Sequence, residues 1–289
     1  MSLRWEDQGR DWPGRGFSRF VAAGGLRWHV QVAGNGPVLL LLHGTGASTH
    51  SWRDLLPRLA ERFTVVAPDL PGHGFSAALP RERTSLPGFA AALAALLAEL
   101  GLVVRYAAGH SAGAAIAAQL ALQPKSTLER LAWINPALKP FDALPGLLFA
   151  PLARLMATGP LLPRLAAWRA QDPRALRRLI AGTGSTLDER GVSLYQRLVA
   201  SPDHVAGALS MMAGWDLAPL VEALPRLQQP VLLLVGEQDG TVPPAQAAQI
   251  APRLRHATLQ RLPGLGHLAH EEKPEWFAER LGAWFSAPG

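Results

Sequence analysis

The sequence contains no cysteine. This absence excludes disulfide bonds, thiolate metal sites and a cysteine nucleophile, and it fits a protein of the cytoplasm. No cluster of metal-ligating side chains and no glycine-rich nucleotide loop is evident in the sequence. We therefore predict that the chemistry of this protein needs no metal and no cofactor.

A hydrophobic run long enough to cross a bilayer is also missing. The longest apolar stretch, Phe89–Ala98, is too short for a membrane span and is followed by Glu99. The segment Met1–Gly16 is polar and charged, whereas a secretory signal has an apolar centre. The sequence thus predicts a soluble protein with a cytoplasmic location.

Charged residues are few, at 17% of the chain, and positive ones predominate to give a net charge of +6. One interpretation is attraction to an anionic membrane surface, an acidic partner or nucleic acid. The other is a set of arginines dispersed over a solvated surface. Because dense Lys/Arg runs and nucleic-acid-binding motifs are absent, we expect no nucleic-acid partner and at most peripheral membrane contact.

Apolar segments of strand length alternate with helical patterns along most of the 289 residues. Two alternating runs around Gly24-Gly25 predict an opening hairpin. The later runs are almost continuously apolar, which is typical of strands covered on both faces, so the pattern predicts a parallel, doubly wound α/β sheet. The expected strands are Phe17–Ala22, Leu26–Val32, Val38–Leu42, Phe63–Ala67, Val103–Ala108, Leu131–Ile134, Val231–Val235 and Ala257–Leu262, and the expected helices are Ser51–Glu61, Leu86–Leu100, Ala112–Leu122, Pro244–Leu254 and Pro274–Phe285.

The alternation stops between Lys139 and Arg226, where no strand is predicted. Amphipathic helical segments separated by Pro and Gly occupy this stretch. A helical insertion in a regular α/β pattern predicts a lid, so residues 1–138 and 227–289 are expected to form one core and residues 139–226 a helical cap. The expected cap helices lie near Leu147–Met156, Leu161–Ala170, Pro173–Ile180, Gly191–Ala200 and His204–Met212.

The segment Gly109-His110-Ser111-Ala112-Gly113 follows a predicted strand and opens a predicted helix. Its small residues permit a tight turn that lifts a nucleophile clear of the sheet. The alternative is an ordinary glycine-rich turn in which the serine caps the helix. The position between a strand and a helix favours Ser111 as a nucleophile.

A serine hydroxyl needs an adjacent base near neutral pH. His267 follows a predicted strand, and Gly266 before it lets the loop fold inward; His270 is the main competitor. The remaining histidines beside glycine turns are more typical of structural roles: His43, His73 and His110.

The base in turn needs an acid that holds its tautomer. Asp239 lies just past the strand Val231–Val235, at an Asp-Gly turn, and Glu237 is its rival. A turn aspartate that satisfies its own backbone is the structural alternative. For the oxyanion, the glycine-rich loop after Val38–Leu42 predicts a backbone N–H donor at Thr45, paired with the N–H of Ala112.

Taken together, these motifs resemble the α/β-hydrolase superfamily, and the chain order Ser, Asp, His is the order of that superfamily. The motifs are His43–Gly46, Asp69–Ser76, Gly109–Gly113, Gly236–Asp239 and Gly266-His267. The resemblance implies an eight-stranded, mostly parallel sheet flanked by helices, with a helical cap inserted after strand 6. It also implies Ser111 as nucleophile, His267 as base, Asp239 as acid, and Thr45 and Ala112 as oxyanion donors.

A closer resemblance is to the magnesium-chelatase accessory proteins of bacteriochlorophyll biosynthesis. It is carried by Gly24–Gln31, His43–Asp54, Gly109–Ala115, Gly182–Ser185 and His204–Leu209. The resemblance implies a place in the pathway, near magnesium insertion, more than it implies a substrate. We further expect a porphyrin or its ester as the small-molecule substrate, contact with magnesium chelatase, and any membrane contact at the inner or photosynthetic membrane. The residues expected to line a substrate pocket are His110, Met211, Met212 and Trp215.

Our leading hypothesis is a serine hydrolase that acts on an ester-like substrate through an acyl-enzyme. The rival is a non-catalytic accessory protein that binds porphyrin or the chelatase on a hydrolase scaffold, because a fold does not fix a function. In that case the methionines and the tryptophan of the cap would face a flat ligand, or simply form the core of the cap. A third hypothesis is C–C bond hydrolysis on the same residues.

Overall fold

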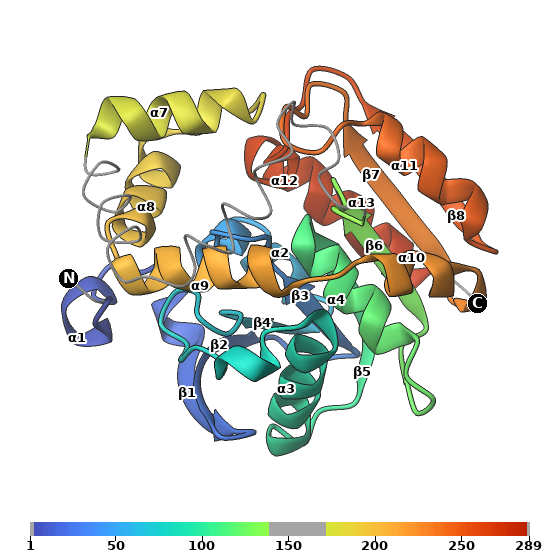
Figure 1. Cartoon of the computed structure of the whole chain (residues 1–289), viewed down its shortest axis with the longest axis horizontal. Coiled ribbons are helices and arrows are strands. Elements are labelled where there is room, and N and C mark those ends of the chain that lie inside the picture. Colours follow the sequence, from blue (N-terminus) through green and yellow to red (C-terminus); the bar gives the residue numbers. More distant parts are fainter. Residues whose placement is uncertain (1–2, 139–171, 288–289) are drawn as a thin grey trace.

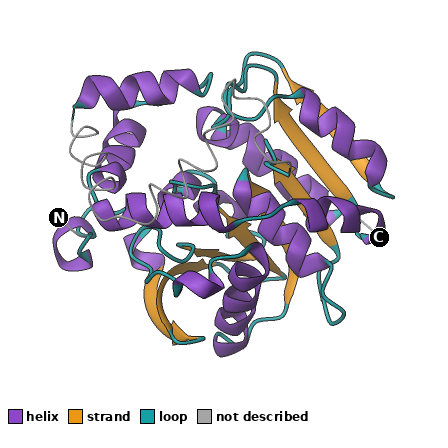
Figure 2. Ribbon diagram, in the orientation of Figure 1, coloured by secondary structure: helices purple, strands orange, loops and turns teal. Residues whose placement is uncertain are grey.

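An eight-stranded sheet forms the centre of the molecule in the computed structural model, which describes residues 3–138 and 172–287 (Figures 1 and 2). The strand order is β1-β2-β4-β3-β5-β6-β7-β8. β2 pairs antiparallel with both β1 and β4, and the other neighbours are parallel. The predicted eight-stranded, mostly parallel sheet is thus confirmed, with strands β1 Ser18–Ala23, β2 Leu26–Ala33, β3 Val38–Leu42, β4 Thr64–Pro68, β5 Val104–His110, β6 Arg130–Ile134, β7 Val231–Gly236 and β8 Ala257–Leu262.

Helices cover both faces of the sheet, which explains why β3 and β7 carry no polar side chain. In β3, Leu40 and Leu42 belong to one core cluster with α3 and α4, whereas Leu39 and Leu41 belong to the opposite cluster with α2 and α13. This two-sided burial follows from the period of two along a strand. The core helices are α2 Leu56–Leu59, α3 Leu86–Glu99, α4 Ala112–Ala121, α11 Ala245–Ile250, α12 Ala269–Glu272 and α13 Pro274–Ser286, and a short helix, α1 Trp5–Gln8, precedes the sheet.

One expected helix, Ser51–Glu61, is wrong as a single element. The chain forms a 3₁₀ turn at Thr49–Trp52 and the separate one-turn helix α2. Pro57 accounts for the division, because proline has no N–H for an interior helical bond and tolerates only the first turn of a helix. In the structure Pro57 stands in the first turn of α2.

The segment after β6 is helical, as predicted. It contains α7 Pro173–Gly182, α8 Glu189–Val199, α9 Pro202–Gly214 and α10 Ala218–Ala223, which we call the cap helices. Side chains at three N-caps accept backbone N–H groups at the helix starts, an arrangement that satisfies donors with no partner inside a helix. The expected helices Leu147–Met156 and Leu161–Ala170 lie outside the described residues.

The parallel strands place six loops at one edge of the sheet. Strands β3 to β8 run in the same direction, so the residues that follow them emerge together at their carboxyl ends. In open α/β sheets this edge is where ligands bind. The loops that leave it contain Thr45, Ser111, Asn135, Asp239 and His267.

Candidate active site

Ser111 occupies the sharp turn between β5 and α4. Its backbone has φ 52° and ψ −117°, a conformation that few non-glycine residues adopt. Close packing makes the two flanking glycines necessary: a Cβ on Gly113 would lie 2.1 Å from the carbonyl oxygen of Leu42, and one on Gly109 would lie 2.5 Å from the nitrogen of Ala114. The N–H of Ser111 donates a hydrogen bond of 3.0 Å to the carbonyl oxygen of Ile134, at the end of β6, and this bond holds the turn in place.

The loop after β7, which carries Asp239, and the loop after β8, which carries His267, meet through a direct hydrogen bond; we call them the acid loop and the base loop after the predicted roles of these residues. Nδ1 of His267 lies 2.7 Å from Oδ2 of Asp239. The other oxygen, Oδ1, accepts the N–H groups of Thr241 and Val242, both at 2.8 Å. The carboxylate therefore contacts its own turn with one oxygen and the imidazole of His267 with the other. Its rival Glu237 is exposed to solvent.

The competing histidine lies deeper in the protein. His270 is fully buried, and neither ring nitrogen has a hydrogen-bond partner among the described residues. Its ring packs 4.7 Å from that of Trp52 and 4.5 Å from that of His110. Burial lowers its pKa to about 3, with Arg53 acting in the same direction. We assign His270 to the packing beneath the site.

His110 does not join the cap residues with which it was grouped as a pocket lining. Its Nε2 donates to the carbonyl oxygen of His267 at 2.8 Å, and the two rings lie 4.7 Å apart. The imidazole is buried, and burial lowers its pKa well below the ordinary value, with His270 acting in the same direction. It therefore supports the backbone of the base loop as a neutral donor.

Asn135, which the sequence did not single out, joins three of the loops. Its Nδ2 donates to the carbonyl oxygens of Gly266 and His267 at 2.9 and 2.8 Å, and its Oδ1 accepts the N–H of Gly236 at 2.7 Å. With φ 44°, Asn135 and Ser111 are the non-glycine residues with positive φ in the described part of the chain. Such conformations persist where the surroundings hold them and cluster at functional sites.

The segment that follows α7 contributes a second link between the acid and base loops. The carbonyl oxygen of Thr183 accepts the N–H of Gly240 at 3.1 Å and the N–H of His267 at 3.0 Å. The hydroxyl of Ser185 accepts the N–H of Leu268 at 2.8 Å. A Cβ on Gly184 would lie 1.7 Å from the carbonyl oxygen of Gln238, so only glycine fits there. The feature of the sequence that points to this contact is the glycine-containing segment Gly182–Ser185.

The predicted oxyanion loop lies against the serine turn. A Cβ on Gly44 would lie 2.9 Å from Cβ of Ser111, which shows how closely the two backbones approach. The N–H of Ala112 is the first of α4, where helical N–H groups have no partner inside the helix. The Thr45 hydroxyl donates to Sδ of Met211 on α9 at 3.1 Å.

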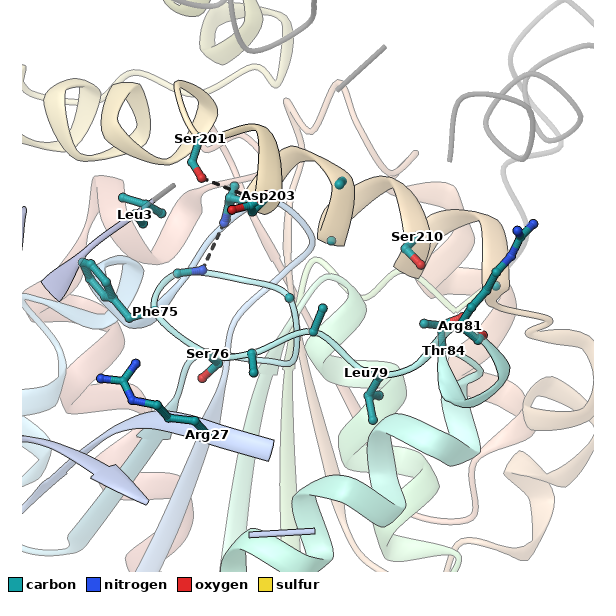
Figure 3. A pocket seen from close by; sticks show the side chains of 18 of the residues that line it. Leu3, Arg27, Phe75, Ser76, Leu79, Arg81, Thr84, Ser201, Asp203 and Ser210 are labelled. Carbon is teal, nitrogen blue, oxygen red and sulfur yellow. Dashed lines mark hydrogen bonds between the residues drawn. The ribbon is translucent and has the colours of Figure 1, made fainter. Parts of the chain in front are cut away.

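The remaining cap residues predicted to line a pocket face different surroundings. Met211 is buried against Thr45, Met212 is 38% exposed, and Trp215 packs edge-on against Phe89 with ring centroids 5.4 Å apart. A pocket of about 790 Å³ does lie along α9, between this helix and the loop that precedes α3 (Figure 3). Its lining includes none of the four predicted residues and none of the loop-end residues Ser111, Asp239 and His267.

Two further findings concern metals and membranes. Within residues 3–138 and 172–287, no group of three or more His, Asp or Glu side chains is arranged to hold a metal ion. None of the helices in the same part of the chain combines the length and apolar character needed to cross a membrane.

Comparisons with known proteins identify the family. The model of the alpha/beta hydrolase fold matches residues 37–274. The magnesium-chelatase 30 kDa subunit of Rhodobacter capsulatus is 41% identical over 280 residues, covering 95% of this chain and 96% of that protein. The pyrrolizixenacetamide deacetylase of Xenorhabdus hominickii is 30% identical over 269 residues, covering 89% of this chain and 94% of that protein.

A solved structure gives the same answer for the fold. The epoxide hydrolase CorEH superposes with a TM-score of 0.77 at 24% identity, covering 93% of this chain and 97% of that one. At this identity the likeness shows the fold alone. The sheet order, the serine turn after β5 and the matched family model lead to one conclusion: this chain belongs to the α/β-hydrolase fold family and is related to the magnesium-chelatase 30 kDa subunit.

Proposed function

We propose that the protein is a serine hydrolase that cleaves an ester-like substrate through an acyl-enzyme. One observation carries the proposal: the His267–Asp239 hydrogen bond of 2.7 Å is tied, through Asn135, to the strand end beside the Ser111 turn. It supports the proposal because a nucleophilic serine needs a base that is itself oriented by an acid.

The chemistry follows from the protonation of the imidazole. Because the Asp239 carboxylate accepts a proton at Nδ1, Nε2 of His267 is left to take the proton of the Ser111 hydroxyl. The serine oxygen attacks the ester carbonyl carbon, and the N–H groups of Thr45 and Ala112 hold the oxyanion. The ester C–O bond then breaks, and His267 gives its proton to the leaving alcohol. Water attacks the acyl-serine in the same way and releases the carboxylic acid.

The substrate class and the cellular context come from the relative. The similar protein of Rhodobacter capsulatus is named as a subunit of magnesium chelatase. We propose that this chain also acts in the cytoplasm beside magnesium insertion in bacteriochlorophyll biosynthesis, with a porphyrin or its ester as substrate and with chelatase contact. Any membrane association would be peripheral and would depend on the net charge of +6.

Labelling with a fluorophosphonate probe tests the enzyme proposal directly. The wild-type protein is expected to be labelled, because the probe reacts with an activated serine, and Ser111→Ala should abolish the signal. Ser193→Ala is the matched control, since this serine is exposed on α8 away from the site, and it should be labelled like the wild type. Folded wild-type protein that stays unlabelled and does not cleave activated esters would contradict the proposal.

A non-catalytic accessory role is the second candidate, favoured by the subunit name of the relative. It predicts saturable quenching of tryptophan fluorescence by a porphyrin, or chelatase binding, that Ser111→Ala leaves unchanged. Pigment production separates the two functions in cells, because only the enzyme needs Ser111. If Ser111→Ala restores pigment to a strain that lacks the gene, the accessory role is preferred.

A further inference from the structure

His204, on the cap helix α9, contacts the loop that carries Thr45. Its side chain is buried, and its Nδ1 accepts the N–H of Gly74 at 3.0 Å. A neutral imidazole that accepts at one nitrogen carries its proton on the other. Nε2 of His204 therefore donates to the carbonyl oxygen of Gly46, at 3.1 Å.

From Gly46 a chain of peptide groups leads to the N–H of Thr45. The carbonyl of Gly46 and the N–H of Ala47 belong to one peptide unit, and that N–H donates to the carbonyl oxygen of Gly44 at 3.2 Å. The carbonyl of Gly44 and the N–H of Thr45 belong to a second peptide unit, which this hydrogen bond connects to the first. Because a peptide is planar and trans, holding its carbonyl fixes the direction of its N–H on the opposite side.

A second histidine holds the same carbonyl from the core side. Nε2 of His43 accepts the N–H of Leu70 at 2.9 Å, so its Nδ1 carries the proton and donates to the carbonyl oxygen of Gly44 at 2.8 Å. The Gly44–Thr45 peptide thus receives one bond directly from the core and one through Ala47 from the cap. Consecutive hydrogen bonds of this kind polarise one another and strengthen the donor at the end of the chain.

We propose that His204 is a positioning residue for the oxyanion donor at Thr45, so that the oxyanion site is complete only when α9 is docked on the core. This inference rests on the proposed serine hydrolase function. The docking is close: a Cβ on Gly207 would lie 2.0 Å from the carbonyl oxygen of Gly72, and Met211, further along α9, accepts the Thr45 hydroxyl. Helix α9 therefore contacts the loop at two points, at the backbone carbonyl of Gly46 through His204 and at the side chain of Thr45 through Met211.

The test compares three variants with the wild type, using hydrolysis of an activated ester and hydrogen exchange of the Ala47 amide. His204→Leu removes the donor, whereas His204→Gln keeps an amide that can donate and accept. Ser201→Ala is the matched control, because it removes the N-cap oxygen that accepts the His204 N–H and leaves the imidazole in place. Gly207→Ala displaces α9 without altering His204 and serves if His204→Leu does not fold.

For His204→Leu we expect kcat to fall about 10- to 100-fold with KM changed less than about 3-fold, because a misdirected donor weakens transition-state binding. Exchange at Ala47 should accelerate at least about 10-fold as its peptide loses the Gly46 bond. His204→Gln should restore most of the wild-type kcat and of the slow Ala47 exchange. Gly207→Ala should show the same losses as His204→Leu, and Ser201→Ala should resemble the wild type.

The readouts separate this inference from the function on which it rests. A wild type that cleaves no ester would remove the hydrolase proposal, and the exchange of Ala47 alone would then decide the positioning role. The inference is overturned if His204→Leu has the same Ala47 amide exchange rate and the same kcat for the ester as Ser201→Ala. Gly207→Ala is judged by the same comparison if His204→Leu does not fold.

Discussion

Single atoms have separate tasks at the meeting point of the loops. The two oxygens of Asp239 divide between the turn that follows β7 and the imidazole of His267. The carbonyl oxygen of His267 accepts both the Asn135 amide and the His110 ring. The backbone and the side chain of His267 are thus held independently, which limits rotation of its ring.

Asp239→Asn is the most informative substitution at this scale. The amide fits the same space, but its NH₂ group favours the wrong tautomer of His267, so kcat for an activated ester should fall about 10³- to 10⁴-fold. Steady-state kinetics measures this loss. Glu237→Gln, two residues away and exposed, is the control and should retain wild-type kcat. A modest loss for Asp239→Asn, equal to that of the control, would argue against the acid role.

Residues of the site differ in how far the sequence predicts them. Ser111, Asp239 and His267 each follow a strand and lie near a glycine, so strand-end position and residue type coincide. Asn135 also follows a strand, but it works by fixing other loops and carries no motif of its own. At Thr183 the contact is made by a backbone carbonyl, which every residue possesses, so no side chain could reveal it.

Between elements, a buried network attaches α8 to the core. The hydroxyl of Tyr195 donates to Oε1 of Glu271 at 2.7 Å, and the guanidinium of Arg53 bonds the other oxygen. Burial raises the pKa of Glu271, while Arg53 and Tyr195 oppose that change. Glu271 lies four residues beyond His267, so the network connects a cap helix to the segment that carries His267.

Tyr195→Phe should therefore destabilise the protein by about 1–3 kcal/mol, because it leaves a buried carboxylate oxygen without its donor. Urea unfolding monitored by circular dichroism measures the change. The ion pair of Arg177 with Glu189, which joins α7 to α8 at the surface, is the matched control. Arg177→Gln should have no measurable effect, since solvent screens exposed pairs. Equal stability of Tyr195→Phe and the wild type would contradict the network's role.

The sequence predicts the elements of the sheet better than the connections between its layers. Strands appear in it because burial on two faces demands apolar residues throughout, as in Val38–Leu42. The division of the stretch Ser51–Glu61 depends on where Pro57 falls in the first turn, and the Tyr195–Glu271 contact joins residues 76 positions apart. Pairing over such distances leaves no local pattern.

Across the whole molecule, buried histidines should make stability sensitive to acid. Burial lowers the pKa of His43 to about 4. It lowers the pKa to about 3 for His73, His204 and His270. The pKa values of His50 and His110 lie well below the ordinary value for the same reason. An unfolded histidine titrates near about pH 6.5, so the unfolded state binds more protons below that pH. The stabilisation is complete above it and is lost as pH falls toward the folded pKa values.

Each such histidine removes about 1.4 kcal/mol per pH unit below about pH 6.5, so unfolding is expected between about pH 4 and 6. Urea titrations at about pH 8.5, 7.5 and 5.5 should give a free energy of unfolding that is nearly flat over the first interval and falls over the second. A free energy that stays constant down to about pH 4 would show that these imidazoles are not buried as neutral groups.

The carbonyl of Thr183, which binds both the acid loop and the base loop, has a consequence for engineering. A chimera that receives its lid from another family member would cut the chain somewhere between β6 and β7. If the junction precedes Gly182, the graft also replaces the residue whose carbonyl joins the loops that carry Asp239 and His267. Transplants that retain the native segment Gly182–Ser185 keep this link, and those that also retain His204 keep the contact of α9 with the loop that carries Thr45.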